Sequence, residues 1–269
     1  GASSFSGNSE SKRYTVQEVI GKGSYGVVCG AIDNLTGERV AIKKITNVFD
    51  NVADATRILR EIKLLRLLKH ADVVDVKHIL LPSDPQSFKD VYVVFERMES
   101  DLHIVIESND DLTHDHHKIC DFGLARPFIP DNAMSPVFWT DYVATRWYRA
   151  PELCGCFYGR YSQAVDIWSV GCIFAEVLLG RPLFRGSDAV SQLQLITDLL
   201  GKPPPAVIDR ISNVKARTFL AALPPKQPRN LADKFPSAHP AALALLRRLL
   251  SFDPLDRPTA AQALEDPYF

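Results

Sequence analysis

The stretch from Lys118 to Glu152 constrains the fold more than any other part of this 269-residue chain. It contains the triplet Asp121-Phe122-Gly123 near its start, ends with Ala150-Pro151-Glu152, and carries Thr140-Asp141-Tyr142 between them. A single Asp-Phe-Gly triplet is common by chance, whereas three such triplets in this order and at this spacing form a specific signature. We therefore expect the fold to be organised around this segment.

Composition narrows the class of protein. The contents of 46% hydrophobic and 23% charged residues are ordinary for a globular protein, and a net charge of −1 predicts no general attraction to nucleic acid or to an anionic membrane. The most apolar run, residues 167–180, is too short to span a bilayer and contains Glu176. The five cysteines are odd in number and form no CxxC pair, so we expect reduced thiols, a cytoplasmic or nuclear protein, and no cysteine-held metal.

The N-terminal part reads as a tail followed by strands around a glycine-rich motif. Residues 1–13 are rich in Ser, Gly and Asn and are expected to be disordered. From Tyr14 the sequence is strand-like, and Gly21, Gly23 and Gly26 form a GxGxxG. Dinucleotide-binding folds share this spacing but continue into a helix, whereas the β-branched Val27-Val28 favours another strand. A hairpin over phosphate groups is favoured, because glycines let backbone N–H groups approach the oxygens.

Three further elements follow from periodicity. The next strand carries Val40-Ala41-Ile42-Lys43, and alternation puts Ala41 and Lys43 on one face, while Lys44 points the other way and is expected to be solvated. Residues 54–69 have aliphatic side chains near helical spacing, which places Glu61 on a predicted helix. Residues 91–96, VYVVFE, are predicted to form a buried strand.

The three triplets, together with VATRWYRAPE, resemble the activation segment of mitogen-activated protein kinases, and the Thr-Asp-Tyr triplet is similar to plant members. The resemblance covers residues 14–269 apart from one junction. It implies an α+β, bilobal protein-kinase-like fold, with a small β-rich N-lobe at 14–98 and a mostly helical C-lobe at 99–269 that contains the activation segment, 121–152. It also implies ATP- and Mg²⁺-dependent phosphoryl transfer to Ser or Thr before proline, in a signalling cascade.

The resemblance assigns roles to individual residues. Asp121 would bind the metal, and an upstream dual-specificity kinase would phosphorylate Thr140 and Tyr142. The implied ATP-binding residues are Ile20, Gly21, Lys22, Gly23, Ser24, Tyr25, Gly26, Val28, Ala41, Lys43, Glu61, Glu96 and Met98. The arginines expected to bind the phosphates are Arg60, Arg126, Arg146 and Arg149. Glu61 would pair with Lys43, and Glu152 would form a buried ion pair with Arg257. Asp101 would hydrogen-bond the ribose or cap a helix.

The junction between His117 and Lys118 lacks a segment that the resemblance requires. The family has a long helix there and then a catalytic loop, HRDLKPxN, so about forty residues are absent. No His-Arg-Asp occurs anywhere in this sequence. The absent Asp orients the substrate hydroxyl and the absent Asn holds a magnesium ion, so no catalytic residue is assigned and turnover should fall by several orders of magnitude.

The absence of the long helix is also expected to lower the folding stability of the C-lobe. If the absent helix buries about six apolar side chains at about 1.5–3 kcal/mol each, its removal costs about 9–18 kcal/mol, against a stability of about 5–15 kcal/mol for a whole domain. We therefore expect a loose C-lobe, in which Asp166 becomes a buried carboxylate without hydrogen-bond partners unless water enters.

Three interpretations stay open. The chain could be an active kinase with a substitute base, an ATP-binding pseudokinase or scaffold, or a non-functional product of splicing or gene prediction. Three histidines lie near the junction, but nothing in the sequence places them at a cleft. An in-frame loss with intact motifs on both sides favours the third interpretation, because drift toward a pseudokinase usually alters residues without excising a core helix.

Overall fold

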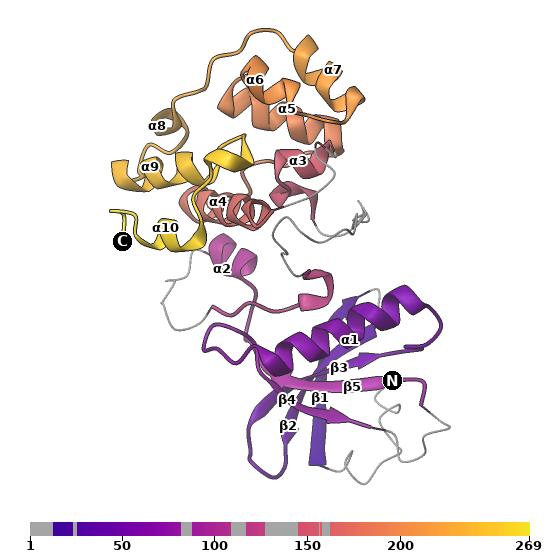
Figure 1. The fold of residues 1–269 in the computed structure, drawn as a ribbon. Helices are drawn as coiled ribbons and strands as arrows, with labels where there is room; N and C mark the ends of the chain where they lie inside the picture. Colours follow the sequence, from indigo (N-terminus) through magenta and orange to yellow (C-terminus); the bar gives the residue numbers. More distant parts are fainter. Residues whose placement is uncertain are drawn as a thin grey trace. The chain divides into compact units, whose positions relative to one another are not determined.

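The computed structural model describes residues 13–23, 26–81, 88–108, 117–126, 145–155, 157 and 162–269. The chain divides into two compact units, one made of Gly1–Val105 with Asp111–Arg126 and the other of Ile106–Asp110 with Pro127–Phe269. Figure 1 shows strands and one long helix in the first unit, and helices in the second. In the described parts of both units, no helix is long and apolar enough to cross a membrane.

The described strands of the first unit form an antiparallel five-stranded sheet in the order β1-β2-β3-β5-β4. Their bounds are Tyr14–Gly23 (β1), Gly26–Asp33 (β2), Arg39–Ile45 (β3), Val76–Leu80 (β4) and Val91–Glu96 (β5). One helix, α1 (Val52–Leu67), lies across the sheet (Figure 1) and begins where the Asn51 side chain accepts a hydrogen bond from the Ala53 N–H. A short 3₁₀ turn, η4 (Phe122–Leu124), also belongs to this unit.

Strand alternation gives the sheet two apolar faces. One core contains Val40 and Ile42 of β3 with Val94 of β5, while the other contains Ile45 and Val93 with Ile58 of α1. Since side chains on a strand alternate between faces, Lys43 lies on the same face as Ile45, the face that α1 covers. This placement brings Lys43 next to α1.

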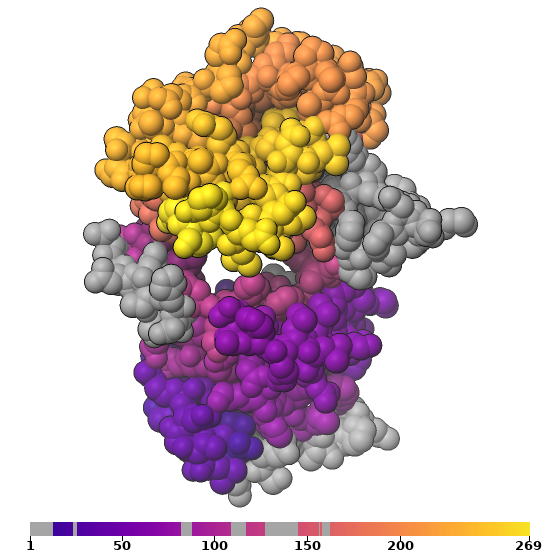
Figure 2. Space-filling model, turned by 60° about the vertical axis from the view of Figure 1, so that its left-hand side comes forward, coloured from indigo at the N-terminus to yellow at the C-terminus, as the bar shows by residue number. Residues whose placement is uncertain are grey.

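The described regular elements of the second unit are helices. After the 3₁₀ turn η5 (Arg146–Tyr148), they are α3 (Pro151–Cys154), α4 (Ala164–Leu179), α5 (Ala189–Leu200), α6 (Pro205–Asp209), α7 (Val214–Ala222), α8 (Leu231–Lys234), α9 (Pro240–Leu249), the 3₁₀ turn η6 (Pro254–Asp256) and α10 (Ala260–Leu264). On the face drawn in Figure 2, much of this unit's surface comes from its C-terminal residues, in orange and yellow. The division between the units falls inside α2 (Leu102–Ser108).

The core of the second unit is built around α4. Trp168, Cys172 and Ala175 of this helix are fully or almost fully buried and pack with residues of α5 and α9, including Ile196 and Leu246. Glu152 and Arg257 form the predicted buried ion pair, with two parallel hydrogen bonds of 2.7 and 2.8 Å. The pair joins α3 to the segment before α10, which is a structural role.

A sheet-rich unit and a helical unit confirm the predicted α+β, bilobal kinase-like fold. Residues 117–126, which the sequence predicted for the helical lobe, group with the sheet. They do so because the Ile119 N–H donates to the Asp72 carbonyl at 2.7 Å and the Val74 N–H donates to the Ile119 carbonyl at 3.0 Å. The division itself lies at Val105 and Ile106 rather than near residue 98.

Candidate nucleotide-binding site

An ion pair between Lys43 and Glu61 stands at the centre of the candidate site. The Lys43 Nζ donates to both carboxylate oxygens of Glu61, at 2.9 and 3.0 Å. The pairing follows from the local structure, since β3 directs Lys43 toward α1 and the helical repeat turns Glu61 toward the sheet. Glu61 is 8% exposed, and a carboxylate at such a position requires a cation. The two residues predicted to pair therefore do pair.

The glycine-rich motif forms the β1–β2 hairpin. Gly21 pairs with Val28 across the ladder, and Gly23 pairs with Gly26. Gly26 has a φ of 150°, and a Cβ atom there would lie 1.8 Å from the Lys44 carbonyl oxygen, so only glycine fits. Ser24 and Tyr25, at the tip, lie outside the described residues.

The other predicted ATP-binding residues that the structure describes also belong to the first unit. Ala41 lies on β3, buried on the same side as Lys43, and Met98 follows β5. Ile20 and Lys22 are exposed on β1, while Val28 is half-buried on β2. The unit thus holds all the described members of the predicted set.

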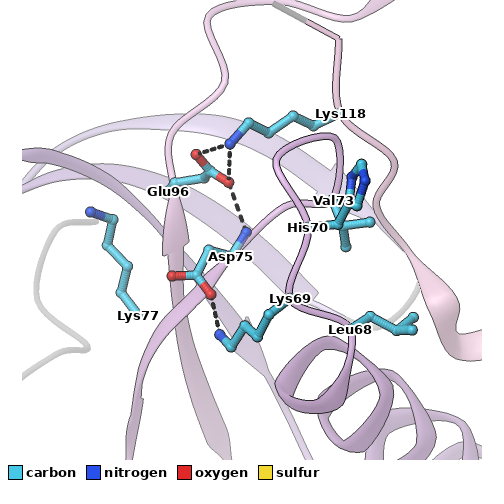
Figure 3. A pocket seen from close by; sticks show the side chains of 8 residues that line it. All are labelled: Leu68, Lys69, His70, Val73, Asp75, Lys77, Glu96 and Lys118. Atoms are coloured by element: carbon cyan, nitrogen blue, oxygen red, sulfur yellow. Dashed lines mark hydrogen bonds and ion pairs between the residues drawn. The ribbon is translucent and has the colours of Figure 1, made fainter.

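Glu96, at the end of β5, has a side-chain role that sequence reasoning did not foresee. Its carboxylate accepts two hydrogen bonds from the Lys118 Nζ, at 2.9 and 2.8 Å, and one from the Asp75 N–H at 2.7 Å (Figure 3). Lys118 directly follows the junction in the sequence. The carboxylate of Glu96 therefore holds the segment that leads to Asp121.

A pocket of about 460 Å³ adjoins the ion pair of Glu96 and Lys118 (Figure 3). It is lined by Leu68, Lys69, His70, Val73, Asp75, Lys77, Glu96 and Lys118. Its three lysines are each paired with a carboxylate, namely Asp75, Glu38 and Glu96. The lysine charges are therefore compensated within the chain. Apart from Glu96, the pocket contains none of the predicted ATP-binding residues.

Asp121 adopts a left-handed backbone conformation, with φ 60° and ψ 67°. Asp and Asn tolerate this region best among residues with a side chain, and such strained positions cluster at functional sites. Desolvation and then the carboxylates of Asp121 and Glu61 raise the pKa of the neighbouring Cys120 thiol, while the Lys43 ammonium lowers it. Asp121, Glu61 and Lys43 therefore all lie close enough to the Cys120 thiol to influence its pKa.

A cluster of arginines lies beside η4. Arg60 of α1 donates to the Gly123 carbonyl at 3.0 Å, and Arg126 donates to the Ala125 carbonyl at 2.9 Å. Burial and then the positive charges of Arg60 and Arg57 lower the pKa of Arg126. Sequence reasoning missed Arg57, although its spacing of three residues from Arg60 on a predicted helix was a usable signal.

The other two predicted phosphate-binding arginines belong to the second unit. Arg146 donates to the Ser187 carbonyl at 2.5 Å, and the Arg149 N–H donates to the Arg146 carbonyl at 3.0 Å. The structure thus brings Arg60 and Arg126 together in one unit and keeps Arg146 and Arg149 in the other. Thr140 and Tyr142, the predicted phosphorylation sites, lie outside the described residues.

Three expectations about single residues are settled by the structure. Asp101 caps α2, because its Oδ1 accepts a hydrogen bond from the Ile104 N–H at 2.9 Å. The expectation of a solvated Lys44 is wrong, since its side chain is 18% exposed and pairs with Asp90 at 3.1 Å. Asp166 is exposed on α4 rather than buried, which is the exception that the expectation allowed for, although partial desolvation still raises the pKa of its carboxyl.

The family model of the protein kinase domain matches residues 14–117 and 104–269. Together these ranges cover nearly the whole chain, so this chain belongs to the protein kinase family. The two matched ranges overlap between residues 104 and 117, directly before the junction.

Within that family, the chain is similar to plant mitogen-activated protein kinases. It is 58% identical to mitogen-activated protein kinase 15 of Arabidopsis thaliana over 97% of this chain and 51% of the relative. It is 56% identical to mitogen-activated protein kinase 20 of Arabidopsis thaliana and to mitogen-activated protein kinase 8 of Oryza sativa subsp. japonica, over 98% of this chain and 50% and 53% of those relatives. The chain spans about half the length of the curated relatives it matches.

The first of these alignments is longer than this chain. Its 297 positions contain 97% of 269 residues, about 261, so about 36 positions are filled only in the relative.

Proposed function

We propose that this chain is a serine/threonine kinase of the mitogen-activated class whose first unit binds ATP and Mg²⁺, and whose phosphoryl transfer is severely impaired. The observation that carries the proposal is the Lys43–Glu61 ion pair, at 2.9 Å. An ion pair of a strand lysine with a helix glutamate marks a kinase site that is ready for nucleotide.

Each part of the site would contact a different part of the nucleotide. Lys43 would neutralise the α- and β-phosphates, and the glycine-rich hairpin would approach the phosphate oxygens through its backbone N–H groups. The backbone groups from Glu96 to Met98 would face the adenine edge. These contacts use groups that the first unit already holds in place.

The metal would be held by few protein groups. No cluster of three or more His, Cys, Asp or Glu residues that could bind a metal occurs among the residues that the structure describes. Mg²⁺ suits a site of this kind, because it is usually bound by one or two carboxylates together with substrate phosphates and water. Asp121 would supply the carboxylate, so we expect metal and nucleotide to bind together.

Impaired transfer follows from the sequence at the junction. No His-Arg-Asp occurs in this chain, so no residue is assigned to orient or deprotonate the substrate hydroxyl. General-base and positioning effects are worth about 10²–10⁴-fold each. The about 36 positions that only the relative fills, and the family match that is split before Lys118, support the proposal that the catalytic loop is absent.

The regulatory part of the proposal concerns the activation segment. An upstream dual-specificity kinase would phosphorylate Thr140 and Tyr142, and the arginine cluster of Arg57, Arg60 and Arg126 would bind one of the phosphates. Protein substrates would carry Ser or Thr before proline. A signalling role of this kind suits the cytoplasm or the nucleus.

Nucleotide binding is tested by the thermal shift that ATP and Mg²⁺ produce, with Lys43→Met as the disabling variant. The adjacent Lys44→Met is the matched control, because Lys44 lies on the same strand but pairs with Asp90 on the other side. We expect ATP–Mg²⁺ to raise the melting temperature of the unaltered protein and of Lys44→Met, but not that of Lys43→Met. Equal shifts in both variants would contradict the assigned site.

Transfer is tested with a Ser-Pro peptide after treatment with an upstream kinase. We expect a rate at least about 10³-fold below that of a full-length relative. A rate near that of the relative would show that another group replaces the missing base. A thermal shift without any transfer would favour the second candidate function, an ATP-binding pseudokinase or scaffold, which the absent His-Arg-Asp supports.

A further inference from the structure

Arg97, the first residue after β5, reaches β1 and β2 through its side chain. Its Nη2 donates to the Glu18 carboxylate of β1 at 2.8 Å. Its Nη1 lies against Gly30 of β2, since a Cβ atom on that glycine would stand 2.8 Å from Nη1. One side chain of the first unit thus connects the segment after β5 with both strands of the glycine-rich hairpin.

The register of the sheet shows on which face this contact lies. Gly30 pairs with Ala41 across the β2–β3 ladder, and Val28 pairs with Lys43. Residues directly opposite each other in an antiparallel ladder have their side chains on the same face of the sheet. The Arg97 guanidinium therefore lies on the face that carries Ala41 and Lys43, which is the face proposed to receive the nucleotide.

The guanidinium depends on a single carboxylate. The Arg97 side chain is 11% exposed, whereas the side chain of its partner Glu18 is 54% exposed. The Nε and Nη1 atoms of Arg97 are buried and have no hydrogen-bond partner among the residues that the structure describes. Removing the Glu18 carboxylate would leave a buried cation without compensation, so we expect the guanidinium to leave this position when the ion pair is broken.

Glycine at position 30 makes the contact possible. A Cβ atom on Gly30 would also lie 3.4 Å from the Arg97 Cζ and 3.4 Å from the Glu18 Oε1. Glycine inside a strand often marks a site where another group approaches the backbone closely, and here that group is the guanidinium. A larger residue on β2 would therefore displace Arg97 from the face of the sheet without removing its charge from the chain.

The two segments that Arg97 connects are both assigned to the base of the nucleotide. Glu18 lies two residues before Ile20, where the predicted nucleotide-binding residues of β1 begin. Arg97 itself lies between Glu96 and Met98, whose backbone groups would face the adenine edge. The ion pair of Arg97 with Glu18 therefore determines how far β1 stands from the segment after β5.

We propose that Arg97 is a positioning residue for nucleotide binding, which holds β1 in place for the base through its pair with Glu18 and its contact with Gly30. The inference rests on the proposed function, because it concerns the same site. Without the pair, the bound nucleotide would have to order the hairpin itself, and that cost would lower the affinity.

The test measures the affinities of ATP–Mg²⁺ and of adenosine, each by competition with the fluorescent analogue mant-ATP, at a temperature far below the melting transition. Arg97→Leu removes the cation, and Gly30→Val fills its position with a residue that favours strands. We expect each variant to bind both ligands about tenfold more weakly, which is the effect of losing one hydrogen bond between charged groups. The double variant should bind no more weakly than Arg97→Leu, because both changes remove the same contact.

Arg39→Leu is the matched control variant. Arg39 of β3 pairs at 3.1 Å with Glu99, which also belongs to the segment after β5, but both side chains are exposed. Exposed ion pairs contribute little, so this variant should bind both ligands within about twofold of the unaltered protein.

Two outcomes would overturn the positioning role and leave the proposed function intact. A loss of affinity for ATP without a loss for adenosine would show that Arg97 acts on the phosphates through its charge. Unchanged affinities in Arg97→Leu and Gly30→Val, together with lower melting temperatures, would show that the ion pair only stabilises the sheet. If the unaltered protein bound neither ligand, the proposed function would fail, and this inference would fail with it.

Discussion

Asp33 illustrates how one guanidinium holds a buried carboxylate in its charged form. The Arg13 Nη2 donates to Asp33 at 2.6 Å, and the Leu35 N–H donates to it at 3.0 Å. The hydrogen bonds from Arg13 are the main reason why the pKa of Asp33 lies below its ordinary value. A lowered pKa means that the charged form stabilises the fold above the unfolded pKa of about 3.9, and that this stability is lost as the pH falls through the folded pKa.

Replacing Asp33 by Asn should therefore lower the stability of the first unit at pH 7 and weaken the dependence of that stability on pH below about 4. Urea unfolding between pH 7 and pH 3 measures both effects. Asp50→Asn, which alters an exposed carboxylate in the same unit, is the control and should leave the stability at pH 7 within about 0.5 kcal/mol of the unaltered protein. An identical slope for Asp33→Asn and the unaltered protein at low pH would contradict the assigned role of this ion pair.

The contact of α4 with α9 depends on a glycine. A Cβ atom at Gly171 would lie 2.9 Å from the Leu250 Cδ2 and 3.0 Å from the Leu249 Cβ. Gly171→Ala should destabilise the second unit by about 1–3 kcal/mol through overpacking, reduced by up to about 1 kcal/mol because alanine favours a helix. Urea unfolding measures the change. Val170→Ala, one residue away and exposed, should stay within about 0.5 kcal/mol. A Gly171→Ala variant more stable than the unaltered protein would show that α9 moves freely.

Local sequence patterns predict the helices and strands whose formation depends mainly on residues close together in the chain. The helix predicted at residues 54–69 corresponds to α1, and the apolar run at 91–96 coincides with β5. Strand alternation also orients Lys43 correctly. Each of these features depends on residues a few positions apart.

Side-chain pairings between distant segments could not be predicted in the same way. Which segments lie side by side in space decides two ion pairs, that of Glu96 with Lys118 and that of Lys44 with Asp90. Two pairings were foreseen, Lys43 with Glu61 and Glu152 with Arg257, because the family resemblance supplied the partner.

The proposed loss at the junction would affect the two units differently. The Asp-Phe-Gly segment stays with the sheet, because Lys118 is held by Glu96 and Ile119 by Asp72 and Val74. In the second unit, in contrast, the central helix α4 exposes the aliphatic side chains of Val170, Ile173 and Val177. We therefore expect ligand binding to depend on the first unit, and we expect the second unit to be the less stable of the two.

Hydrogen exchange with and without ATP–Mg²⁺ tests this separation. A ligand at about 100 times its Kd stabilises the part that binds it by about 2.7 kcal/mol, so exchange from β3 and α1 should slow about 100-fold. Exchange from α5 and α9 should be faster from the start and should not respond to the nucleotide, because the Lys43–Glu61 site is built from the first unit alone. Equal slowing in all four elements would show that the two units open together, and the second unit would then have no lower stability of its own.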